Sequence, residues 1–461
     1  MVTRIKTADE TFIARKKNET FIVDAGTDLV FLDDNIGILG SKKVGGRTIR
    51  VDGTIDAPLN GSNAIQIECS GTNLERIIVG STGEVSATGD AIVAGHGVGG
   101  GSLVDIRVSG NVEGGIDAIF LNTGTATLRN SGTIKGGSFS AVNSVAGDLT
   151  LKNSGSIEAV AQDASAIVAT GRKFGLTNTG TVISENGVAL LLDEGTSGAG
   201  KITIVNDGTI AGAVDAIRAE SSPSNRAFTI VNTGEIIGNI NLSGSERNDV
   251  VNTSNGHFEG DILTGDGDDR IAMIEAIVTG TVFGGLGDDV YTISSGDIAI
   301  VENADAGTDT IRAVGGVSVI LGANFENLVL IGKRDTFHAA GNELDNTITG
   351  NAGDNVINGA EGEDTIRGGK GFDELAGGAD IDTFIFRKGD DKDVIGDFDI
   401  DAITHDVVDL SGIKGITGFG DLINHHARVV DGDVVINAGD GDRVVLEGLA
   451  LTDLRVDMFL L

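Results

Sequence analysis

Short aliphatic runs separated by Asn, Gly and Ser recur throughout the first half of the chain. The clearest unit has the form apolar-x-Asn-x-Gly-x-apolar, and it occurs as LRNSGTI (128–134), LKNSGSI (151–157), LTNTGTV (176–182), IVNDGTI (204–210) and IVNTGEI (230–236). Weaker copies extend the series, so that the central glycines fall at positions 53, 83, 110, 132, 155, 180, 208, 234 and 256. A second signal, alanine followed by an aliphatic residue, comes shortly after the glycine of each unit, from Ala64 to Ala216.

Two short β-prone runs per unit, separated by turn residues, predict that each unit forms one coil of a parallel β-helix. The aliphatic residues would point inward and stack on the same position of the neighbouring coils. A β-sandwich would instead show hairpin signals and alternating polarity, and it would not keep this register. We expect the third-position asparagines to form a side-chain amide ladder at a tight turn, and the glycine two positions later to adopt a positive φ. The ladder comprises Asn130, Asn153, Asn178, Asn206 and Asn232.

A shorter repeat begins near residue 341. Five contiguous nonapeptides follow one another as GNELDNTIT, GNAGDNVIN, GAEGEDTIR, GGKGFDELA and GGADIDTFI, from 341 to 385. Glycines permit a tight turn and leave backbone carbonyls free to face a cation, the sixth residue supplies a side-chain oxygen, and the aliphatic eighth residue enters the core. Two nonapeptides make one coil, so every second copy should stack. The predicted metal ligands are the side chains of Asn346, Asn355, Asp364, Asp373 and Asp382 and the glycines Gly359, Gly368 and Gly377.

These nonapeptides resemble the RTX family, the hemolysin-type calcium-binding repeat proteins such as the serralysin C-terminal domain. The resemblance implies a parallel β-roll that binds several calcium ions between successive turns. It extends to the acidic segment that ends in DLSG (409–412), and the terminal Asp457–Leu461 looks like the uncleaved C-terminal signal of type I secretion substrates. A terminal core strand is the alternative for that segment. The charged amino terminus lacks the apolar core of a signal peptide, which also favours type I export.

The acidic register extends backwards from the nonapeptides. Asp249, Asp269, Asp289 and Asp309 follow one another at a constant step of 20, and Asn327, Asn346, Asp364 and Asp382 continue the series at steps of 18, 19, 18 and 18. We expect one column of oxygen ligands, on coils that tighten from the long β-helix unit to the step of 20 and then to the step of 18. Solvated acidic turns explain Asp249 and Asp309 equally well when each is taken alone.

The charge of the chain supports a cation. Its net charge is −35, of which residues 246–461 carry −28, and this balance argues against nucleic acid as a partner. Carboxylates stacked one coil apart would lie about 4.8 Å from one another. Their repulsion is about 3–4 kcal/mol at an effective dielectric near 20, which calcium would relieve. The single cysteine, Cys69, excludes a disulfide framework, and no apolar run is long enough to span a membrane.

The chain is therefore expected to be one elongated all-β solenoid, a parallel β-helix that continues into an RTX calcium β-roll. A short helix is expected within 421–429 and a closing hairpin within 434–449. The predicted parts are an N-terminal cap (1–48), the β-helix (49–243), a transitional solenoid with degenerate RTX copies (244–340), the β-roll (341–386) and a C-terminal cap with the secretion signal (387–461).

The function expected from this organisation lies outside a bacterial cell. The β-helix half broadly resembles the secreted rhizobial exopolysaccharide glycanases, and HExxH, the protease motif, is absent. The chain has no Trp and one Tyr, whereas sugar clefts usually stack rings on such side chains. We therefore favour a secreted or cell-surface matrix or adhesion protein that binds extracellular polysaccharide. The alternative is a lyase or glycanase acting on acidic exopolysaccharide, with candidate residues Asp90, Asp117 and Asp215 near Arg107 or Arg218; turn-capping aspartates explain these positions equally well.

Overall fold

The computed structural model describes most of the chain. The described residues are 2–5, 12–14, 20–23, 28–30, 38–40, 48–58, 62–67, 74–95, 103–192, 200–219, 226–333 and 336–461. Most of the predicted N-terminal cap, together with Cys69 and His96, lies outside them. The chain forms two compact units, which we call unit 1 (1–267 with 276–280) and unit 2 (268–275 with 281–461).

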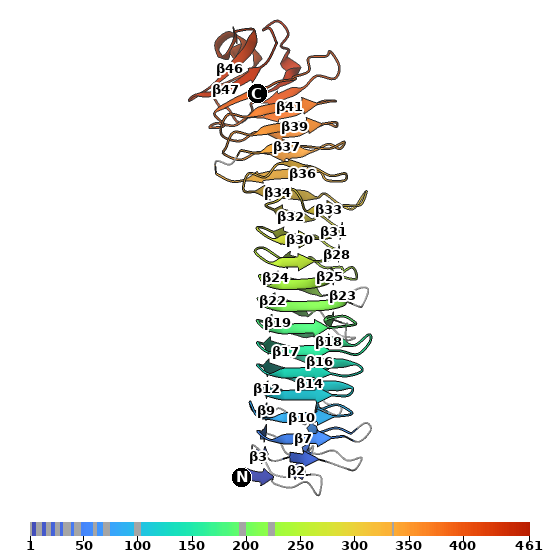
Figure 1. The fold of residues 1–461 in the computed structure, drawn as a ribbon. Helices are drawn as coiled ribbons and strands as arrows, with labels where there is room; N and C mark the ends of the chain where they lie inside the picture. The colour runs from blue at the N-terminus through green and yellow to red at the C-terminus, as the bar shows by residue number, and fades with distance from the viewer. Residues whose placement is uncertain are drawn as a thin grey trace. The chain divides into compact units, whose positions relative to one another are not determined.

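Unit 1 is built from parallel coils (Figure 1), and within the described residues from β3 (Thr20–Val23) to β28 (Ile262–Asp266) each coil contributes to three sheet faces. The Asn-x-Gly sequence unit spans the turn between the strands of two of these faces. What the sequence indicated as one β-prone run is therefore two strands. The first face holds β1 (Val2–Ile5), β3 (Thr20–Val23), β6 (Thr48–Val51), β9 (Leu74–Val79), β12 (Leu103–Val108), the ends of β14 (Asp117–Asn130) and β16 (Ser140–Asn153), β19 (Lys173–Asn178), β22 (Lys201–Asn206), β24 (Ala227–Asn232) and β26 (Val250–Asn252).

The two other faces of unit 1 repeat the same stacking. The second holds β4 (Asp28–Val30), β7 (Thr54–Ala57), β10 (Glu84–Ala87), β13 (Asn111–Gly114), β15 (Thr133–Gly136), β17 (Ser156–Ala159), β20 (Thr181–Ser184), the starts of β23 (Thr209–Ala219) and β25 (Glu235–Asn241), β27 (His257–Glu259) and β30 (Ile277–Thr279). The third holds β2 (Phe12–Ala14), β5 (Ile38–Gly40), β8 (Ile65–Ile67), β11 (Ile92–Ala94), the starts of β14 and β16, β18 (Ser165–Ala169), β21 (Leu190–Leu192), the ends of β23 and β25, and β28 (Ile262–Asp266).

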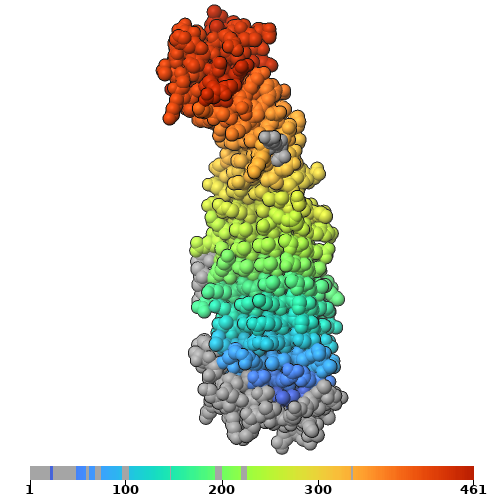
Figure 2. All heavy atoms as spheres, turned by 90° about the vertical axis from the view of Figure 1, so that its left-hand side faces the viewer, coloured from blue at the N-terminus to red at the C-terminus, as the bar shows by residue number. Residues whose placement is uncertain are grey.

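The register of the coils confirms the spacing read from the sequence. Glu84 pairs with Asn111, Asn111 with Thr133, and Thr133 with Ser156, and each of these residues directly follows one of the predicted central glycines. The surface of unit 1 follows the same order, with successive coils visible as successive bands of colour (Figure 2). The aliphatic residue of the second signal forms one fully buried stack, which contains Ile92, Ile119, Val142, Ile167, Leu190 and Ile217.

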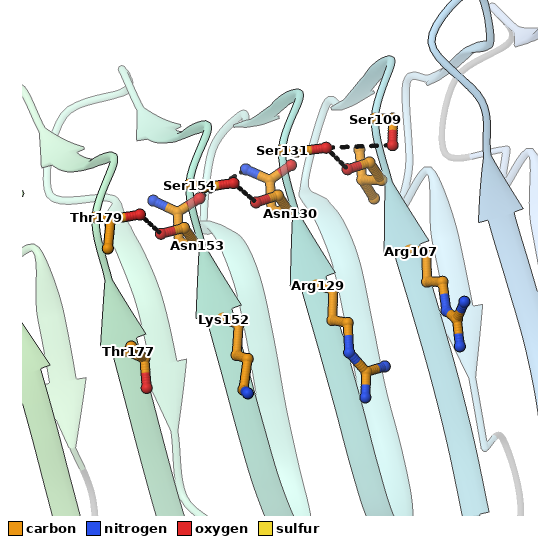
Figure 3. A pocket seen from close by; sticks show the side chains of 11 residues that line it. Arg107, Ser109, Arg129, Asn130, Ser131, Lys152, Asn153, Ser154, Thr177 and Thr179 are labelled. Atoms are coloured by element: carbon orange, nitrogen blue, oxygen red, sulfur yellow. Dashed lines mark hydrogen bonds between the residues drawn. The ribbon is translucent and has the colours of Figure 1, made fainter.

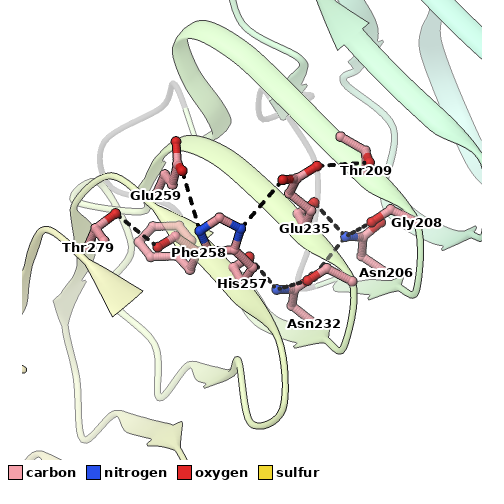
Figure 4. A network of polar contacts seen from close by, with 10 residues as sticks. Asn206, Gly208, Thr209, Asn232, Glu235, His257, Phe258, Glu259 and Thr279 are labelled. Carbon is pink, nitrogen blue, oxygen red and sulfur yellow. Dashed lines mark hydrogen bonds and ion pairs between the residues drawn. The ribbon is translucent and has the colours of Figure 1, made fainter. Parts of the chain in front are cut away.

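The asparagine ladder is present along the predicted column. Each Nδ2 donates to the Oδ1 of the next asparagine, at 2.7 to 2.8 Å, from Asn130 through to Asn232. At the end of the ladder, Asn232 Nδ2 donates to the carbonyl of His257, whose ring lies 3.4 Å from both Glu235 and Glu259 (Figure 4).

The explanation expected for the neighbouring glycines was wrong. Gly132, Gly155 and Gly180 do not have a positive φ. Each instead packs against the backbone of the previous coil. A Cβ on Gly132 would stand 2.0 Å from the carbonyl oxygen of Gly110, so close backbone approach excludes a side chain here.

Unit 2 is also built from parallel coils, which are shorter than those of unit 1. Thr310 pairs with Val290, which matches the predicted step of 20, and Thr347, Thr365 and Thr383 stack at the predicted step of 18. One sheet face holds β29 (Arg270–Met273), β32 (Val290–Ile293), β34 (Thr310–Val314), β36 (Asn327–Ile331), β38 (Thr347–Thr349), β40 (Thr365–Arg367), β42 (Thr383–Ile385), β44 (Val407–Asp409) and β48 (Phe459–Leu460). The other holds β35 (Val319–Ile320), β37 (His338–Ala340), β39 (Val356–Ala360), β41 (Glu374–Gly378), β43 (Lys392–Ile395), β47 (Asp442–Leu446), β46 (Asp433–Gly439) and β45 (Ala427–Val430); β31 (Thr281–Leu286) pairs with β33 (Ala299–Val301).

The C-terminal segment closes unit 2 much as expected. The short helix appears as α1 (Phe419–Asp421) and a π-helical turn (Leu422–His426), and β46 and β47 form the antiparallel hairpin. After a 3-10 turn (Val456–Met458), β48 pairs with β44 and buries Phe459, whereas Leu460 and Leu461 are exposed. The terminal segment therefore adds a short edge strand to the core, which is compatible with the expected secretion signal. Among the described residues, no helix is long and apolar enough to cross a membrane.

Candidate functional site

A column of acidic side chains follows the turns that precede one sheet of unit 2. Each carboxylate accepts a hydrogen bond from the backbone N–H of the corresponding residue one coil earlier. Asp289 Oδ1 accepts from Asp269 at 2.7 Å, and Asp309 Oδ1 accepts from Asp289 at 2.9 Å. In the nonapeptides the same bond runs from Asp364 to Asp382 Oδ1, at 2.9 Å. One oxygen of each carboxylate therefore fixes the distance between coils.

A second column serves the opposite sheet. Asp373 Oδ1 accepts from the N–H of Asn355 at 2.8 Å, and Asp393 Oδ1 accepts from Asp373 at 3.1 Å. The nonapeptides alternate between the two columns because two of them make one coil. Sequence reasoning extended only one column and stopped at 382, so it missed Asp393 and also Asp406, whose Oδ1 accepts from Asp382 at 3.0 Å. The available signal for both was an acidic residue directly before a valine, as in Asp393-Val394 and Asp406-Val407.

The second carboxylate oxygen has no hydrogen-bond partner at five of these positions within the described part of the chain. All five residues are at most 1% exposed, so water does not compensate the charge. A buried carboxylate without a partner is strongly unfavourable, and a cation is the usual remedy. These oxygens are Oδ2 of Asp289, Asp309, Asp364, Asp373 and Asp382.

Glycine leaves the space that these oxygens face. A Cβ on Gly359 would stand 2.0 Å from Asp364 Oδ2 and 2.4 Å from the carbonyl oxygen of Gly377. A Cβ on Gly368 would stand 2.2 Å from Asp373 Oδ2, and a Cβ on Gly377 would stand 2.0 Å from Asp382 Oδ2. A carboxylate oxygen and a glycine carbonyl of the next coil thus meet beside a glycine without a side chain. This donor set suits calcium, which prefers carboxylate and carbonyl oxygens.

The electrostatics of the columns also favour a bound cation. Burial raises the pKa of Asp364 and Asp373 to about 6 and that of Asp382 to about 7. Burial raises the pKa of Asp289 and Asp309 to about 7 as well, and nearby carboxylates add to the shift. At neutral pH these groups carry charge at a cost that a divalent ion would offset.

The pH dependence of the calcium-free protein should run opposite to that of the calcium-loaded protein. The folded-state pKa is about 7 for Asp382 and about 6 for Asp364, whereas an unfolded aspartate titrates near 3.9. The folded state therefore binds protons that the unfolded state does not, and calcium-free stability rises as pH falls from about 8 to about 5. With calcium present, protons compete with the ion, and stability should fall over the same range. Melting temperatures measured across this range, with chelator and with calcium, test both signs.

Asn346 and Asn355 mark the beginning of the nonapeptide block. Their Oδ1 atoms accept backbone N–H bonds from Asn342 and Asn351, at 2.8 and 2.9 Å. The predicted glycine carbonyls lie close to them: a Cβ on Gly341 would stand 2.3 Å from Asn346 Oδ1 and 2.1 Å from Gly359 O. Later copies of the repeat carry an aspartate with an unpartnered Oδ2 at this position, whereas these two copies carry a neutral amide. The amide oxygen of each asparagine already accepts one backbone hydrogen bond.

Two earlier positions differ in their surroundings from the nonapeptides. Asp249 lies in unit 1, where its Oδ1 accepts the N–H of Phe228 at 2.8 Å and burial raises its pKa to about 7. Asn327 does not continue the column, contrary to expectation. Thr310 pairs with Asn327, so Glu326 takes the preceding position, and its Oε2 accepts the N–H of Asp309 at 2.7 Å.

Replacement of Gly359 by alanine should remove one calcium site. The added methyl group would occupy the space between Asp364 Oδ2 and the Gly377 carbonyl. We expect one fewer bound calcium per chain, measured by calorimetry or by metal analysis after dialysis. Gly415→Ala is the matched control, because no atom lies within 4 Å of its added Cβ. Equal calcium content in both variants would contradict the site.

Unit 1 carries a different candidate site, an open groove of about 400 Å³ across successive coils (Figure 3). Cationic side chains extend side by side from β12, β14 and β16, and a row of hydroxyls follows the turn next to the asparagine ladder. Ser131 Oγ donates to Ser109 Oγ at 3.2 Å, and Ser154 Oγ donates to the carbonyl of Asn130 at 3.2 Å. We call this surface the basic groove; its cationic and hydroxyl-bearing lining residues are Arg107, Arg129, Lys152, Ser109, Ser131, Ser154, Thr177 and Thr179.

A buried carboxylate organises the arginines of the basic groove. Asp105 is 7% exposed and forms ion pairs with Arg107 at 2.9 Å, with Arg129, and with Arg76 at 3.6 Å. Three guanidinium groups around one carboxylate leave a positive excess of two. Lys152 takes part in none of the ion pairs found among the described residues. The groove is therefore locally cationic in a chain of net charge −35.

The candidate catalytic aspartates are placed differently from the basic groove. Asp90 and Asp117 are neighbours, because Asp90 Oδ1 accepts the N–H of Asp117 at 3.2 Å, and burial raises the pKa of both. Asp117 is held by Ser140 at 2.6 Å and Asn143 at 2.9 Å. Asp215 pairs with the side chains of Arg218 and Asn239. Arg107 binds Asp105 instead of these aspartates.

Comparison with known proteins agrees with the repeats. The model of the RTX calcium-binding nonapeptide repeat (4 copies) matches residues 340–375 and 358–392. These residues are therefore RTX repeats, and the cofactor they bind is calcium. Asp364, Asp373 and Asp382 lie within the match, whereas Asp289 and Asp309 lie outside it.

Two individual proteins are similar to parts of the chain. The endo-1,3-1,4-beta-glycanase EglC of Rhizobium meliloti (strain 1021) is 38% identical over 201 residues, which are 43% of this chain and 39% of that protein. The chain thus spans about two fifths of the length of this relative. The crystal structure of the extracellular lipase LipA from Serratia marcescens matches with 13% identity and a TM-score of 0.18, over 57% of this chain and 45% of the lipase.

Proposed function

We propose that the protein is a secreted, calcium-loaded β-solenoid that binds an acidic polysaccharide outside the bacterial cell, as a matrix or adhesion protein. The observation that carries this proposal is the basic groove, a cationic surface in a strongly acidic chain. The RTX repeats support export by type I secretion machinery and folding in external calcium. The similarity to a glycanase over part of the chain supports a polysaccharide as the partner.

The basic groove suits a long anionic chain better than a small ligand. Cations and hydroxyls recur on consecutive coils, which are about 4.8 Å apart. A polysaccharide presents its acidic groups and hydroxyls as a repeat of comparable spacing. Arg107 and Arg129 keep guanidinium N–H groups beyond those that bond Asp105, and these can bind carboxylates. The row of Ser131 and Ser154 offers hydrogen bonds to sugar hydroxyls.

Cleavage of the bound polysaccharide is the second candidate function. It is favoured by the contact between Asp90 and Asp117, whose raised pKa values resemble those of paired acid–base groups. The side-chain hydrogen bonds that Asp117 receives from Ser140 and Asn143 favour a structural role instead. Viscosity and new reducing or unsaturated ends, followed in mixtures of calcium-loaded protein and acidic exopolysaccharide, distinguish cleavage from binding.

Neutralising the basic groove should weaken binding to acidic glycans. We expect the triple variant Arg107→Gln, Arg129→Gln and Lys152→Gln to bind immobilised polygalacturonate at least about tenfold more weakly, a loss of about 1.4 kcal/mol. Binding by the unsubstituted protein should also fall as salt rises. Lys135→Gln, Arg270→Gln and Arg312→Gln provide a control with the same change of net charge on other strands.

The outcome separates three possibilities. Equal weakening by both triple variants would mean that binding depends on net charge and would reject the groove. If the protein binds neutral 1,3-1,4-β-glucan and the groove variant binds it equally well, the polysaccharide site lies elsewhere on the chain. Retention on polygalacturonate that only the groove variant loses would establish the proposed surface.

A further inference from the structure

Three buried acids come together in unit 2 outside the matched repeats. Asp289 precedes β32, Glu302 follows β33, and Asp309 precedes β34. One carboxylate oxygen from each lies within 4.8 Å of the others. The three residues are 0%, 4% and 1% exposed. Spacing along the chain indicated Asp289 and Asp309 but gave no reason to include Glu302, which falls outside the regular step of the column.

Each acid uses one oxygen in the fold and leaves the other without a partner. Asp289 and Asp309 accept backbone N–H bonds through Oδ1, from Asp269 and Asp289. Glu302 Oε1 accepts the hydroxyl of Tyr291, the single tyrosine of the chain. Among the described residues, no group donates to Asp289 Oδ2, Asp309 Oδ2 or Glu302 Oε2. Backbone N–H groups of Asn303 and Gly285 also stabilise the Glu302 carboxylate. One buried oxygen of each of the three acids nevertheless has no donor, so their charge is only partly compensated.

The cluster surrounds a space kept open by a glycine. A Cβ on Gly284 would stand 2.0 Å from Asp289 Oδ2, 2.1 Å from the Tyr291 hydroxyl and 2.5 Å from Glu302 Oε1. The oxygens of three side chains therefore converge beside Gly284. Tyr291 is itself fully buried and packs edge-on against Phe325, at 5.8 Å between ring centroids, which fixes the hydroxyl in place.

We propose that Asp289, Glu302 and Asp309 form a separate site for a divalent cation of the size of calcium. Calcium accepts oxygen ligands at about 2.3–2.6 Å, so one ion bridges oxygens separated by up to 4.8 Å. Magnesium requires shorter distances, of about 2.0–2.1 Å, and a stricter geometry. The site differs from those of the nonapeptides because three carboxylates, from two turns of the acidic column and the loop between them, supply its charge.

The composition of the chain offers a specific probe of this site. Terbium replaces calcium at oxygen sites and emits when a nearby aromatic ring transfers excitation to it. The chain has no tryptophan, and its one tyrosine bonds to Glu302. Emission excited through tyrosine therefore reports on the ion beside Tyr291, whereas total calcium content reports on all sites together.

The experiment titrates terbium into the full chain after removal of calcium. We expect tyrosine-sensitised emission that calcium abolishes at a lower concentration than magnesium does. Glu302→Gln should weaken terbium binding at this site at least about tenfold, because it removes a charge and keeps the shape of the side chain. Asp364→Asn, in the nonapeptide block, is the matched control and should lower total bound calcium without changing the sensitised emission.

A second variant separates loss of the site from loss of the fold. Tyr291→Phe should abolish the sensitised emission but keep the calcium content of the unsubstituted protein. The absence of sensitised emission in the unsubstituted protein would overturn the proposal. So would unchanged emission in Glu302→Gln, or emission that persists in Tyr291→Phe.

Discussion

Removal of calcium by a chelator is expected to unfold the nonapeptide repeats while the β-helix of unit 1 stays folded. Asp364, Asp373 and Asp382 each bury an oxygen that has no hydrogen-bond partner among the described residues. Without a cation, the negative charge of these buried carboxylates is not compensated. The core of unit 1 is instead stabilised by aliphatic stacking and by the neutral asparagine ladder, which do not require an ion.

The expected size of this effect follows from linkage. A site with calcium a hundredfold above its dissociation constant contributes about 2.7 kcal/mol, so three sites contribute about 8 kcal/mol. This is comparable to the whole stability of an ordinary domain. Amide hydrogen exchange should show loss of protection over 341–386 in chelator and retained protection over 103–192. Protection of both segments without calcium would contradict the role of these carboxylates.

Stacking made the β-helix predictable from local sequence. Because parallel coils place equivalent residues directly above one another, the interval between glycines is the register itself, as the pairing of Asn111 with Thr133 shows. The third strand of each coil escaped prediction because strands on either side of the Asn-x-Gly turn read as one run. The sequence alone suggested that the repeat glycines are needed for a positive φ. The actual reason, the close approach of Gly132 to the carbonyl of Gly110, involves a residue of the neighbouring coil and is therefore not visible in the local sequence.

The ligand sites were predictable only where the repeat was strict. In the nonapeptides, fixed spacing placed Asp364 and Gly377 together without knowledge of the fold. Between 290 and 330 the coil length changes, and a count along the chain no longer identifies the neighbour. Thus Glu326 instead of Asn327 meets Asp309, and Glu302 joins Asp289 through a loop that spacing does not describe. The basic groove likewise depends on alignment of residues from separate coils.

Replacement of Asn178 by alanine should produce a large loss of stability in unit 1. Asn178 is fully buried, and its Nδ2 donates to Gly180 O, Asn206 Oδ1 and Thr209 O. Its own Oδ1 accepts from Asn153. Alanine would leave buried polar groups unpaired above and below, at about 1–3 kcal/mol each, and we expect a total loss of about 3 kcal/mol or more.

Thr177→Ala is the matched control, because Thr177 is the preceding residue of the same strand and its side chain is exposed. Its effect should stay within about 0.5 kcal/mol. Coils of a solenoid interact mainly with their nearest neighbours, so the loss of protection in Asn178→Ala should centre on the coils that contain Asn153 and Asn206. Hydrogen exchange resolved by segment measures this. If both substitutions weaken the same coils equally, or if protection falls uniformly along unit 1, the amide ladder is not what holds consecutive coils in register.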